Sequence, residues 1–171
     1  RRLMDRFAHY GWPFFDEGHR GYAREVERWA AEALPPLTAG AENNSDALYA
    51  CVARLVSALG KAGLLRACVP GAWGGLRESL DVRSLCLARE ILARASGLAD
   101  FALAMQGLGS VPITLYGSEQ QKRAFLPRVV AGSAIAAFAL SEPDAGSDVA
   151  ATATTAARDG DAWRLDGTKT W

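Results

Sequence analysis

The sequence predicts an α+β fold that is mostly α in this piece, with a helical domain over residues 1–131 and the start of a β domain over 132–171. Apolar residues recur at helical spacing through most of the first 130 residues. After Gly132 the period changes, and the apolar run Ala134–Leu140 leads into Thr- and Ala-rich segments. Two short strand-like runs then flank the turn residues 159–161. These three observations place a domain boundary near 131–133.

The first two helices show amphipathic stripes. The first stripe consists of Tyr22, Val26, Trp29, Ala30 and Ala33. We expect this helix to stop before Pro35-Pro36, because proline supplies no donor and restricts the residue before it. A second helix is predicted from Ser45, with Gly60 or Gly63 as its stop. Its stripe consists of Leu48, Cys51, Val52, Leu55 and Leu59.

Residues 64–78 carry glycine and proline around Trp73, which predicts a long loop. Trp73 is interpreted as a packed anchor of this loop or as a lid over a pocket. Helical spacing resumes in two segments that contain few charges, so we expect burial on more than one side. Their apolar positions are Leu85, Ala88, Leu92 and Ala95, then Phe101, Leu103, Met105 and Leu108.

A further helix begins at Ser118, which forms a capping box with Gln121. Its predicted apolar face is Phe125, Leu126 and Val129, and Gly132 ends it. Beyond it, we expect a buried strand at Ala134–Leu140, an exposed strand at Thr152–Arg158 and a hairpin arm at Trp163–Asp166. So few strands leave unpaired edges unless more chain covers them. With a start at Arg1 and an end in a strand-like segment, we expect the sequence to be part of a longer protein.

Composition excludes several classes of function. Nineteen basic residues balance nineteen acidic ones without a basic run, which argues against nucleic acid as a partner. Cys51, Cys68 and Cys86 are too widely spaced for a zinc ribbon, and we interpret all three as reduced and structural, with Cys51 and Cys86 on apolar helical faces. His9 and His19 are predicted at the surface, and no metal is assigned.

No membrane span is expected, because the longest apolar run, Ala134–Leu140, is far shorter than the about 20 residues that a bilayer requires. No basic start followed by an apolar stretch is present, so cytoplasmic location is expected.

The block Ser141–Asp148 ends the apolar run and is rich in turn residues. Taken by itself it is a strand end with a Glu-Pro turn and a glycine. Its density of backbone and hydroxyl donors also fits a site for an anionic or carbonyl-bearing ligand. The residues alone favour the plain turn over the ligand site.

Several motifs, in order, resemble those of the acyl-CoA dehydrogenase family. They are Tyr116-Gly117-Ser118-Glu119-Gln120-Gln121-Lys122, Leu126-Pro127, Ser141-Glu142-Pro143-Asp144-Ala145-Gly146-Ser147-Asp148, Gly160 through Gly167-Thr168-Lys169-Thr170-Trp171, and the earlier Val69-Pro70 and Trp73-Gly74-Gly75. Together these motifs span most of residues 45–171. The resemblance implies that the β part opens a β-barrel-like middle domain, and that a C-terminal four-helix bundle is absent from this sequence.

The resemblance also implies an FAD site. Its cofactor-binding residues would be Phe138, Leu140, Ser141, Gly146, Ser147 and Trp171. The Ser141 hydroxyl would lie near flavin N5; many relatives have Thr there, so the hydroxyl is kept while the lost methyl loosens its rotamer. Ser147 would contact both the FAD pyrophosphate and the acyl-CoA substrate, and Gly146 would let the backbone come close. Trp171 would pack against the flavin ring.

The implied activity is α,β-dehydrogenation of an acyl-CoA thioester with hydride transfer to FAD. The resemblance places the catalytic Glu in the absent C-terminal domain, so no residue here is assigned as catalytic, and this piece alone is expected to be inactive. Glu142 and Asp148 are interpreted as groups that fix the turn and loop. Family members imply an electron-transfer flavoprotein or similar acceptor, fatty acid metabolism, and a homotetramer or homodimer.

Alternatives of the same fold remain. They are an acyl-CoA oxidase, a flavin monooxygenase and a dehydrogenase that acts on acyl-carrier-protein thioesters. A non-catalytic subunit derived from the family is a further alternative. The apolar helices around Leu103–Leu115 fit an acyl-chain tunnel or a plain buried helix equally well.

Overall fold

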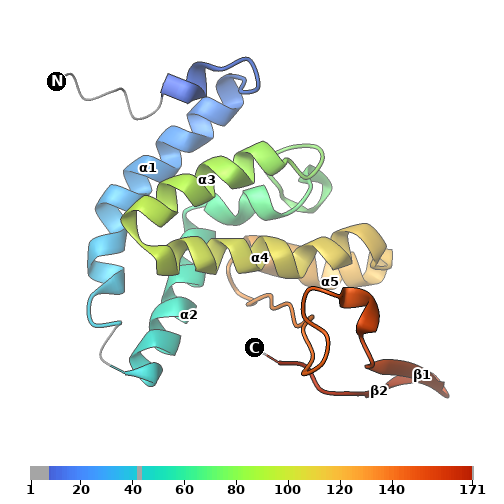
Figure 1. The fold of residues 1–171 in the computed structure, drawn as a ribbon. Helices are drawn as coiled ribbons and strands as arrows, with labels where there is room; N and C mark the ends of the chain where they lie inside the picture. Colours follow the sequence, from blue (N-terminus) through green and yellow to red (C-terminus); the bar gives the residue numbers. More distant parts are fainter. Residues whose placement is uncertain (1–7, 42–43, 171) are drawn as a thin grey trace. The chain divides into compact units, whose positions relative to one another are not determined.

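The computed structural model describes residues 8–41 and 44–170. Contacts divide the chain into two compact units, Arg1–Ala137 and Phe138–Trp171. The first unit is helical and the second contains a β-hairpin (Figure 1). The predicted fold class, a helical domain followed by the first strands of a β domain, is confirmed.

In the first unit, the residues that the structure describes form five α-helices and three short 3-10 helices. These are η1 (Ala8–Gly11), α1 (Glu17–Thr38), α2 (Ser45–Lys61), η2 (Leu64–Cys68), η3 (Gly71–Trp73), α3 (Val82–Ala95), α4 (Gly97–Tyr116) and α5 (Glu119–Val130). Helix α3 packs against α1 and α4, while α4 also packs against α2 and α5 (Figure 1). The capping box of Ser118 and Gln121 opens α5 as predicted, and Gly132, at φ +65°, follows its end.

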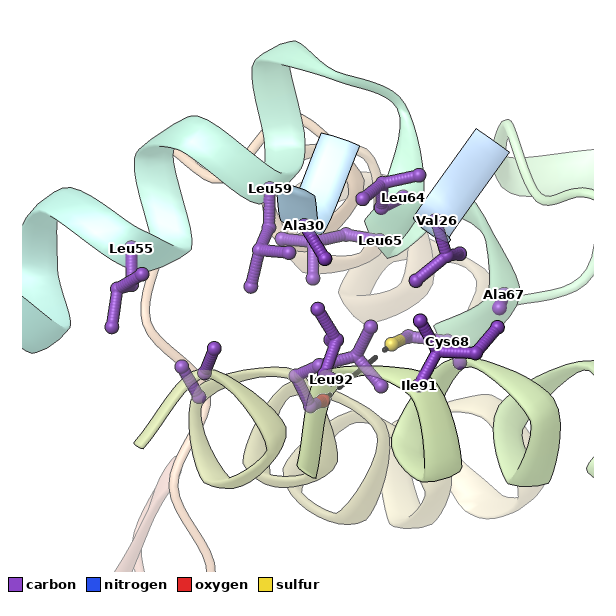
Figure 2. Packing of buried hydrophobic residues seen from close by; sticks show 14 of the residues in the cluster. Val26, Ala30, Leu55, Leu59, Leu64, Leu65, Ala67, Cys68, Ile91 and Leu92 are labelled. Carbon is purple, nitrogen blue, oxygen red and sulfur yellow. Dashed lines mark hydrogen bonds between the residues drawn. The ribbon is translucent and has the colours of Figure 1, made fainter. Parts of the chain in front are cut away.

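The hydrophobic core of this unit is built from facing stripes of α1, α2, η2, α3 and α4. Figure 2 shows side chains from these elements directed toward one interior. Its labelled members are Val26, Ala30, Leu55, Leu59, Leu64, Leu65, Ala67, Cys68, Ile91 and Leu92. The predicted stripe of α2 is confirmed at Cys51, Leu55 and Leu59, whereas Leu48 is 39% exposed. Ala62 caps α2, and Gly63 follows at φ +75°.

Helix α1 does not stop before Pro35-Pro36 as predicted but continues to Thr38. The φ angle of proline is compatible with a helix, but proline has no N–H, so the carbonyl four residues earlier loses its hydrogen-bond donor. Those carbonyls belong to Ala31 and Glu32, which are exposed, so water can reach them. Burial of Leu34 and the bond from Thr38 Oγ1 to its carbonyl (2.9 Å) hold the last turn.

The predicted loop over residues 64–78 is wrong at its start, because residues 64–68 form the largely buried 3-10 helix η2. Tyr22 Oη donates to the Leu64 carbonyl at 2.7 Å and joins η2 to α1. Trp73, in η3, is half-buried and packs against the core. A Cβ on Gly75 would overlap the Val69 carbonyl, so this turn is closely packed. These contacts favour the anchor interpretation of Trp73.

Helix α4 buries one face only, contrary to the prediction. Its buried face is Ala99, Ala102, Leu103, Gln106, Gly107 and Ser110. Phe101 and Leu108 on the other face are 58% and 49% exposed. The scarcity of charge misled the prediction, because this outer face is apolar as well. In the described part of the chain, α4 alone has the length and apolarity of a membrane span, a test that core helices of soluble proteins also pass.

Cys86 is exposed, so its predicted burial in an apolar face is wrong, while Cys51 and Cys68 are buried. All three cysteines are free.

His19 is fully buried, so its predicted surface position is also wrong. The Asp16 N–H donates to His19 Nδ1 (3.1 Å), and Nε2 lies 2.7 Å from Asp81 Oδ2. Asp16 caps α1 and Asp81 caps α3, so a single imidazole joins the beginnings of two helices. His9 is partly exposed and lies 2.9 Å from Glu90.

The second unit contains η4 (Val149–Ala151) and a hairpin of β1 (Thr155–Asp159) and β2 (Ala162–Asp166). The strands pair antiparallel from Thr155 with Asp166 to Asp159 with Ala162. The predicted hairpin is present, but its first strand begins at Thr155 rather than at Thr152, and Asp159 and Ala162 pair within it. Gly160, in the two-residue turn, has φ +61°. Both faces of the hairpin are exposed in this chain.

The predicted buried strand at Ala134–Leu140 is wrong. This segment forms no strand within the described residues, and Ile135 is 59% exposed. A strand requires a neighbouring ladder for its backbone groups. Here the Ala136 N–H donates to a side chain, Gln106 Oε1, at 2.9 Å instead.

Candidate functional site

The most tightly bonded part of the second unit is a turn over Glu142–Ala145. The Glu142 N–H donates to the Ala145 carbonyl (2.9 Å), and the Ala145 N–H donates back to Glu142 (3.2 Å). Pro143 occupies the position where its fixed φ favours such a turn. Among the described residues of this unit, Glu142 and Ala145 are the buried ones, so the turn is the most enclosed part of 138–170.

The Glu142 carboxylate ties this turn to two other segments. Oε2 accepts from the Ala153 N–H (2.7 Å), and Oε1 accepts from the Thr154 N–H (3.1 Å) and from Lys169 Nζ (2.8 Å). The hydrogen bond from Lys169, with those from Thr154 and Ala153, lowers the pKa of Glu142 to about 2. Glu142 is therefore ionised at neutral pH and fixes the turn, as the sequence led us to expect.

Lys169 is a site residue that the sequence reasoning missed. Its Nζ donates to the Leu140 carbonyl (3.0 Å) as well as to Glu142. The Thr170 N–H donates to the Ser141 carbonyl at 2.9 Å. The residues that follow β2 are therefore hydrogen-bonded to Leu140 and Ser141, which lead into the turn. A signal for it was present in the sequence: two of the family motifs contain residues of opposite charge, Glu142 in one and Lys169 in the other.

Gly167 allows the chain to pass closely beside Thr154. It has φ +152°, and a Cβ there would lie 2.7 Å from Thr154 Cβ. This close approach brings Lys169 back toward Glu142. The glycine of the terminal motif thus has a packing reason within this unit.

The three small residues predicted to hold FAD lie on or beside this turn. Ser141 is half-buried, whereas Gly146 and Ser147 are exposed. Within the described residues, neither serine hydroxyl has a protein hydrogen-bond partner, and the N–H groups of Gly146 and Ser147 likewise have no protein acceptor. A Cβ on Gly146 would meet nothing within 4 Å. The turn therefore offers free donors on an open stretch of backbone.

The predicted apolar contacts are Phe138 and Leu140, which precede Ser141. They are 37% and 39% exposed, so their side chains are accessible beside the turn. Trp171, the sixth predicted residue, lies outside the described residues. Asp148 is exposed, and its side chain makes no hydrogen bond to the described residues.

This donor set fits a flavin dinucleotide. Exposed backbone N–H groups and a hydroxyl at Gly146 and Ser147 suit an anionic group such as a pyrophosphate. Ser141 adds a hydroxyl next to the accessible side chains of Phe138 and Leu140, which suit a flat aromatic ring. Within residues 8–41 and 44–170, no three His, Cys, Asp or Glu side chains gather as metal ligands do.

A helical domain followed by such a turn and the first strands of a β domain defines an α+β class of protein. The acyl-CoA dehydrogenase N-terminal domain model matches residues 16–133, and the acyl-CoA dehydrogenase middle domain model matches residues 137–171. The chain belongs to the acyl-CoA dehydrogenase family.

Individual relatives agree with this assignment. A probable acyl-CoA dehydrogenase of Bacillus subtilis (strain 168) is 36% identical over 159 residues, which cover 92% of this chain and 26% of that protein. The human mitochondrial short-chain specific acyl-CoA dehydrogenase is 35% identical over 158 residues, 91% of this chain and 36% of that protein.

Solved structures show the same likeness. An acyl-CoA dehydrogenase from Bacillus anthracis, complexed with FAD, aligns with a TM-score of 0.75 at 36% identity, covering 92% of this chain and 26% of that one. A glutaryl-CoA dehydrogenase from Mycobacterium smegmatis in complex with FADH2 gives 0.73 at 35% identity, covering 92% and 39%. The chain thus spans between 26% and 39% of the length of these four proteins.

Proposed function

We propose that this chain supplies the helical domain and the first part of the flavin-binding domain of an FAD-dependent acyl-CoA dehydrogenase. The reaction would be α,β-dehydrogenation of an acyl-CoA thioester. Family membership supports this, as do the activities for which the relatives are named and the FAD and FADH2 bound in two similar structures.

The observation that carries the proposal is the braced turn between Ser141 and Ser147. The buried Glu142 carboxylate fixes the turn through three donors, while the donors of Gly146 and Ser147 remain open. A rigid backbone with open donors binds an anionic group without first having to be ordered. The same eight residues, Ser141–Asp148, carry the family motif.

When bound, FAD supplies the acceptor for the hydride that leaves the substrate β-carbon. Ser141, Gly146 and Ser147 would hold the cofactor, and Phe138 and Leu140 would exclude water from its ring. The chain's contribution is thus binding and orientation.

Glu142 is not the base that removes the α-proton. Its three donors and its pKa of about 2 make it a weak base at neutral pH. No other residue of this chain is assigned as the base, so we propose that the base comes from a further domain of the protein.

We also propose the division into a helical domain over 1–131 and a flavin-binding domain that begins at 132. The proposed acceptor is an electron-transfer flavoprotein or a similar acceptor, as the family resemblance implies. Homotetramer or homodimer assembly and a role in fatty acid metabolism remain predictions from the family, and the absence of a membrane span remains a prediction from the length of the apolar runs. Cytoplasmic location is proposed as well, and three free cysteines accord with a reducing compartment.

The test begins with the visible absorption spectrum of the purified, desalted protein, together with its intact mass. We expect flavin bands, and we expect Glu142→Gln to weaken FAD binding while the matched Asp148→Asn leaves it unchanged. Turnover is then measured with an artificial electron acceptor and a panel of acyl-CoAs. A full-length protein that stays colourless even with added FAD would contradict the proposal. Bound flavin with no turnover would favour an oxidase or monooxygenase of the same fold.

A further inference from the structure

The segment that follows α5, residues 131–137, lies closely against two helices of the first unit. At its start, Gly60 of α2 faces the backbone of Ala131 and Gly132, and a Cβ on either glycine would overlap the facing backbone. Backbones pack this closely only where side chains are absent. The segment is therefore held against α2 before it reaches α4.

Gln106 binds the same segment further along. Its side chain is 1% exposed on the mostly apolar buried face of α4, where the other buried polar side chain is Ser110. Oε1 accepts from the Ala136 N–H at 2.9 Å, and Nε2 donates to the Ala102 carbonyl of its own helix at 3.4 Å. A buried side-chain amide needs hydrogen-bond partners for both its oxygen and its nitrogen, and here the oxygen bonds the segment.

Gly109, one turn along α4, provides the space for this contact. A Cβ there would lie 2.8 Å from Ala137 N, 2.9 Å from Ala136 Cβ and 2.9 Å from Ala137 O. Any larger residue would push Ala136 and Ala137 away from the helix. Gly107 differs, because a Cβ at that position would make ordinary contacts of 3.7 and 3.8 Å with core side chains.

We propose that Gln106 and Gly109 are positioning residues for the cofactor site. They hold Ala136 and Ala137 on α4 and so fix the point from which the segment Phe138–Ser141 departs. This inference rests on the proposed function, because it gives that segment the role of lining the flavin. It adds two residues of the helical unit to those that determine how FAD is bound.

A first pair of variants separates positioning from plain core stability. Gln106→Met keeps the length of the side chain but removes the acceptor for Ala136 N–H. Ser110→Ala is the control, since its fully buried hydroxyl donates to the Cys68 and Gly107 carbonyls and does not touch the segment. Both variants lose a buried hydrogen bond of the same helix, but only the first frees the segment.

The first readout needs no cofactor. Hydrogen exchange at the Ala136 amide should be about fivefold to tenfold faster in Gln106→Met, the factor that one hydrogen bond of about 1 to 1.4 kcal/mol is worth. Ser110→Ala should match the wild type at this amide. Equal exchange at Ala136 in the wild type and in Gln106→Met would overturn the proposal.

A second pair makes the same chemical change two residues apart. Gly109→Ala should accelerate exchange at the Ala136 amide, whereas Gly107→Ala should not. In the full-length holoprotein, Gln106→Met and Gly109→Ala should each weaken FAD binding about tenfold, while Ser110→Ala and Gly107→Ala stay within about twofold of the wild type.

The outcomes distinguish this inference from the proposed function. Faster exchange with unchanged FAD affinity would overturn the positioning role and leave Gln106 as a structural residue only. A wild-type holoprotein that binds no flavin would contradict the proposed function, and with it the role in cofactor binding. The exchange data would then still decide whether Gln106 and Gly109 hold the segment.

Discussion

Replacing His19 by leucine would remove the imidazole that joins the N-termini of α1 and α3. One lost bond is neutral, from the Asp16 N–H to Nδ1, and is worth about 0.5–1.5 kcal/mol. The other, between Nε2 and Asp81 Oδ2 at 2.7 Å, involves a carboxylate and is worth about 1.5–3 kcal/mol. Asp81 keeps bonds from Ser84 and Arg83, so it is not left unpaired. We therefore expect a loss in the lower half of the summed range, about 2–3 kcal/mol.

The pKa of Asp81 provides a second observable for the same substitution. Burial raises this pKa, but hydrogen bonds from Ser84, Arg83 and His19 together hold it well below the usual range for a carboxyl. Because the folded-state pKa is depressed, the resulting stability is present above the unfolded pKa and is lost as the pH falls through the folded value. Removing His19 should shift the folded pKa of Asp81 upward, so that this contribution to stability is smaller and its loss is complete at a higher pH.

The assay is urea unfolding followed by far-UV circular dichroism, with the slope m checked for constancy. The chain has two histidines, and His9→Leu is the matched control. His9 is partly exposed, and its imidazole forms one ion pair, with Glu90, besides edge contacts with the rings of Tyr10 and Trp12. Leucine can keep part of the ring packing, so the loss should be below about 1 kcal/mol. If the two leucine variants lost the same stability at equal m, the role assigned to the buried imidazole would be refuted.

Three further predictions concern packing and the turn. Gly60→Ala should be about 1–3 kcal/mol less stable than Gly21→Ala in thermal or urea unfolding. The new Cβ at position 60 would overlap the backbone at the α5 C-cap, whereas a Cβ at position 21 would meet nothing within 4 Å, so equal stabilities would count against that close approach. Leu103→Ala should lower the free energy of unfolding by about 2–5 kcal/mol and Leu108→Ala by less than about 1 kcal/mol, since Leu103 is fully buried and Leu108 is 49% exposed. The same urea assay measures both, and similar losses would contradict the assigned faces of α4. The depressed pKa of Glu142 implies that its hydrogen bonds stabilise the turn fully above the unfolded pKa and that this stabilisation is lost as the pH falls through about 2. An NMR titration of its carboxyl carbon with an inflection near the ordinary glutamate value of 4.5 would show that the carboxylate is not bonded in this way.

Much of the fold follows from local patterns in the sequence. The capping box at Ser118, the glycine after α5 and the hairpin around Gly160 depend on neighbouring residues, so they are visible in the sequence. The continuation of α1 through Pro35 depends on tertiary burial of Leu34 and on solvent access to two carbonyls. Such contacts have no local signature.

The candidate site shows the same division. Ser141, Gly146 and Ser147 could be chosen from the motif, and their place in the flavin site remains a prediction. Lys169 acts across the chain on Glu142, and Gln106 acts from a helix on Ala136, so both were missed. A glutamine on a mostly apolar buried face is the signal that could have revealed the second.

The two ties at the base of the hairpin, Lys169 to Glu142 and Thr170 to Ser141, have a practical consequence for protein engineering. These bonds do not involve the hairpin turn, where Gly160 and Asp161 link the exposed strands. Exposed tips of this kind tolerate inserted sequence. A short peptide tag or a fluorophore attachment site placed between Gly160 and Asp161 would therefore report on the second unit without loosening the turn that carries Ser141 and Ser147.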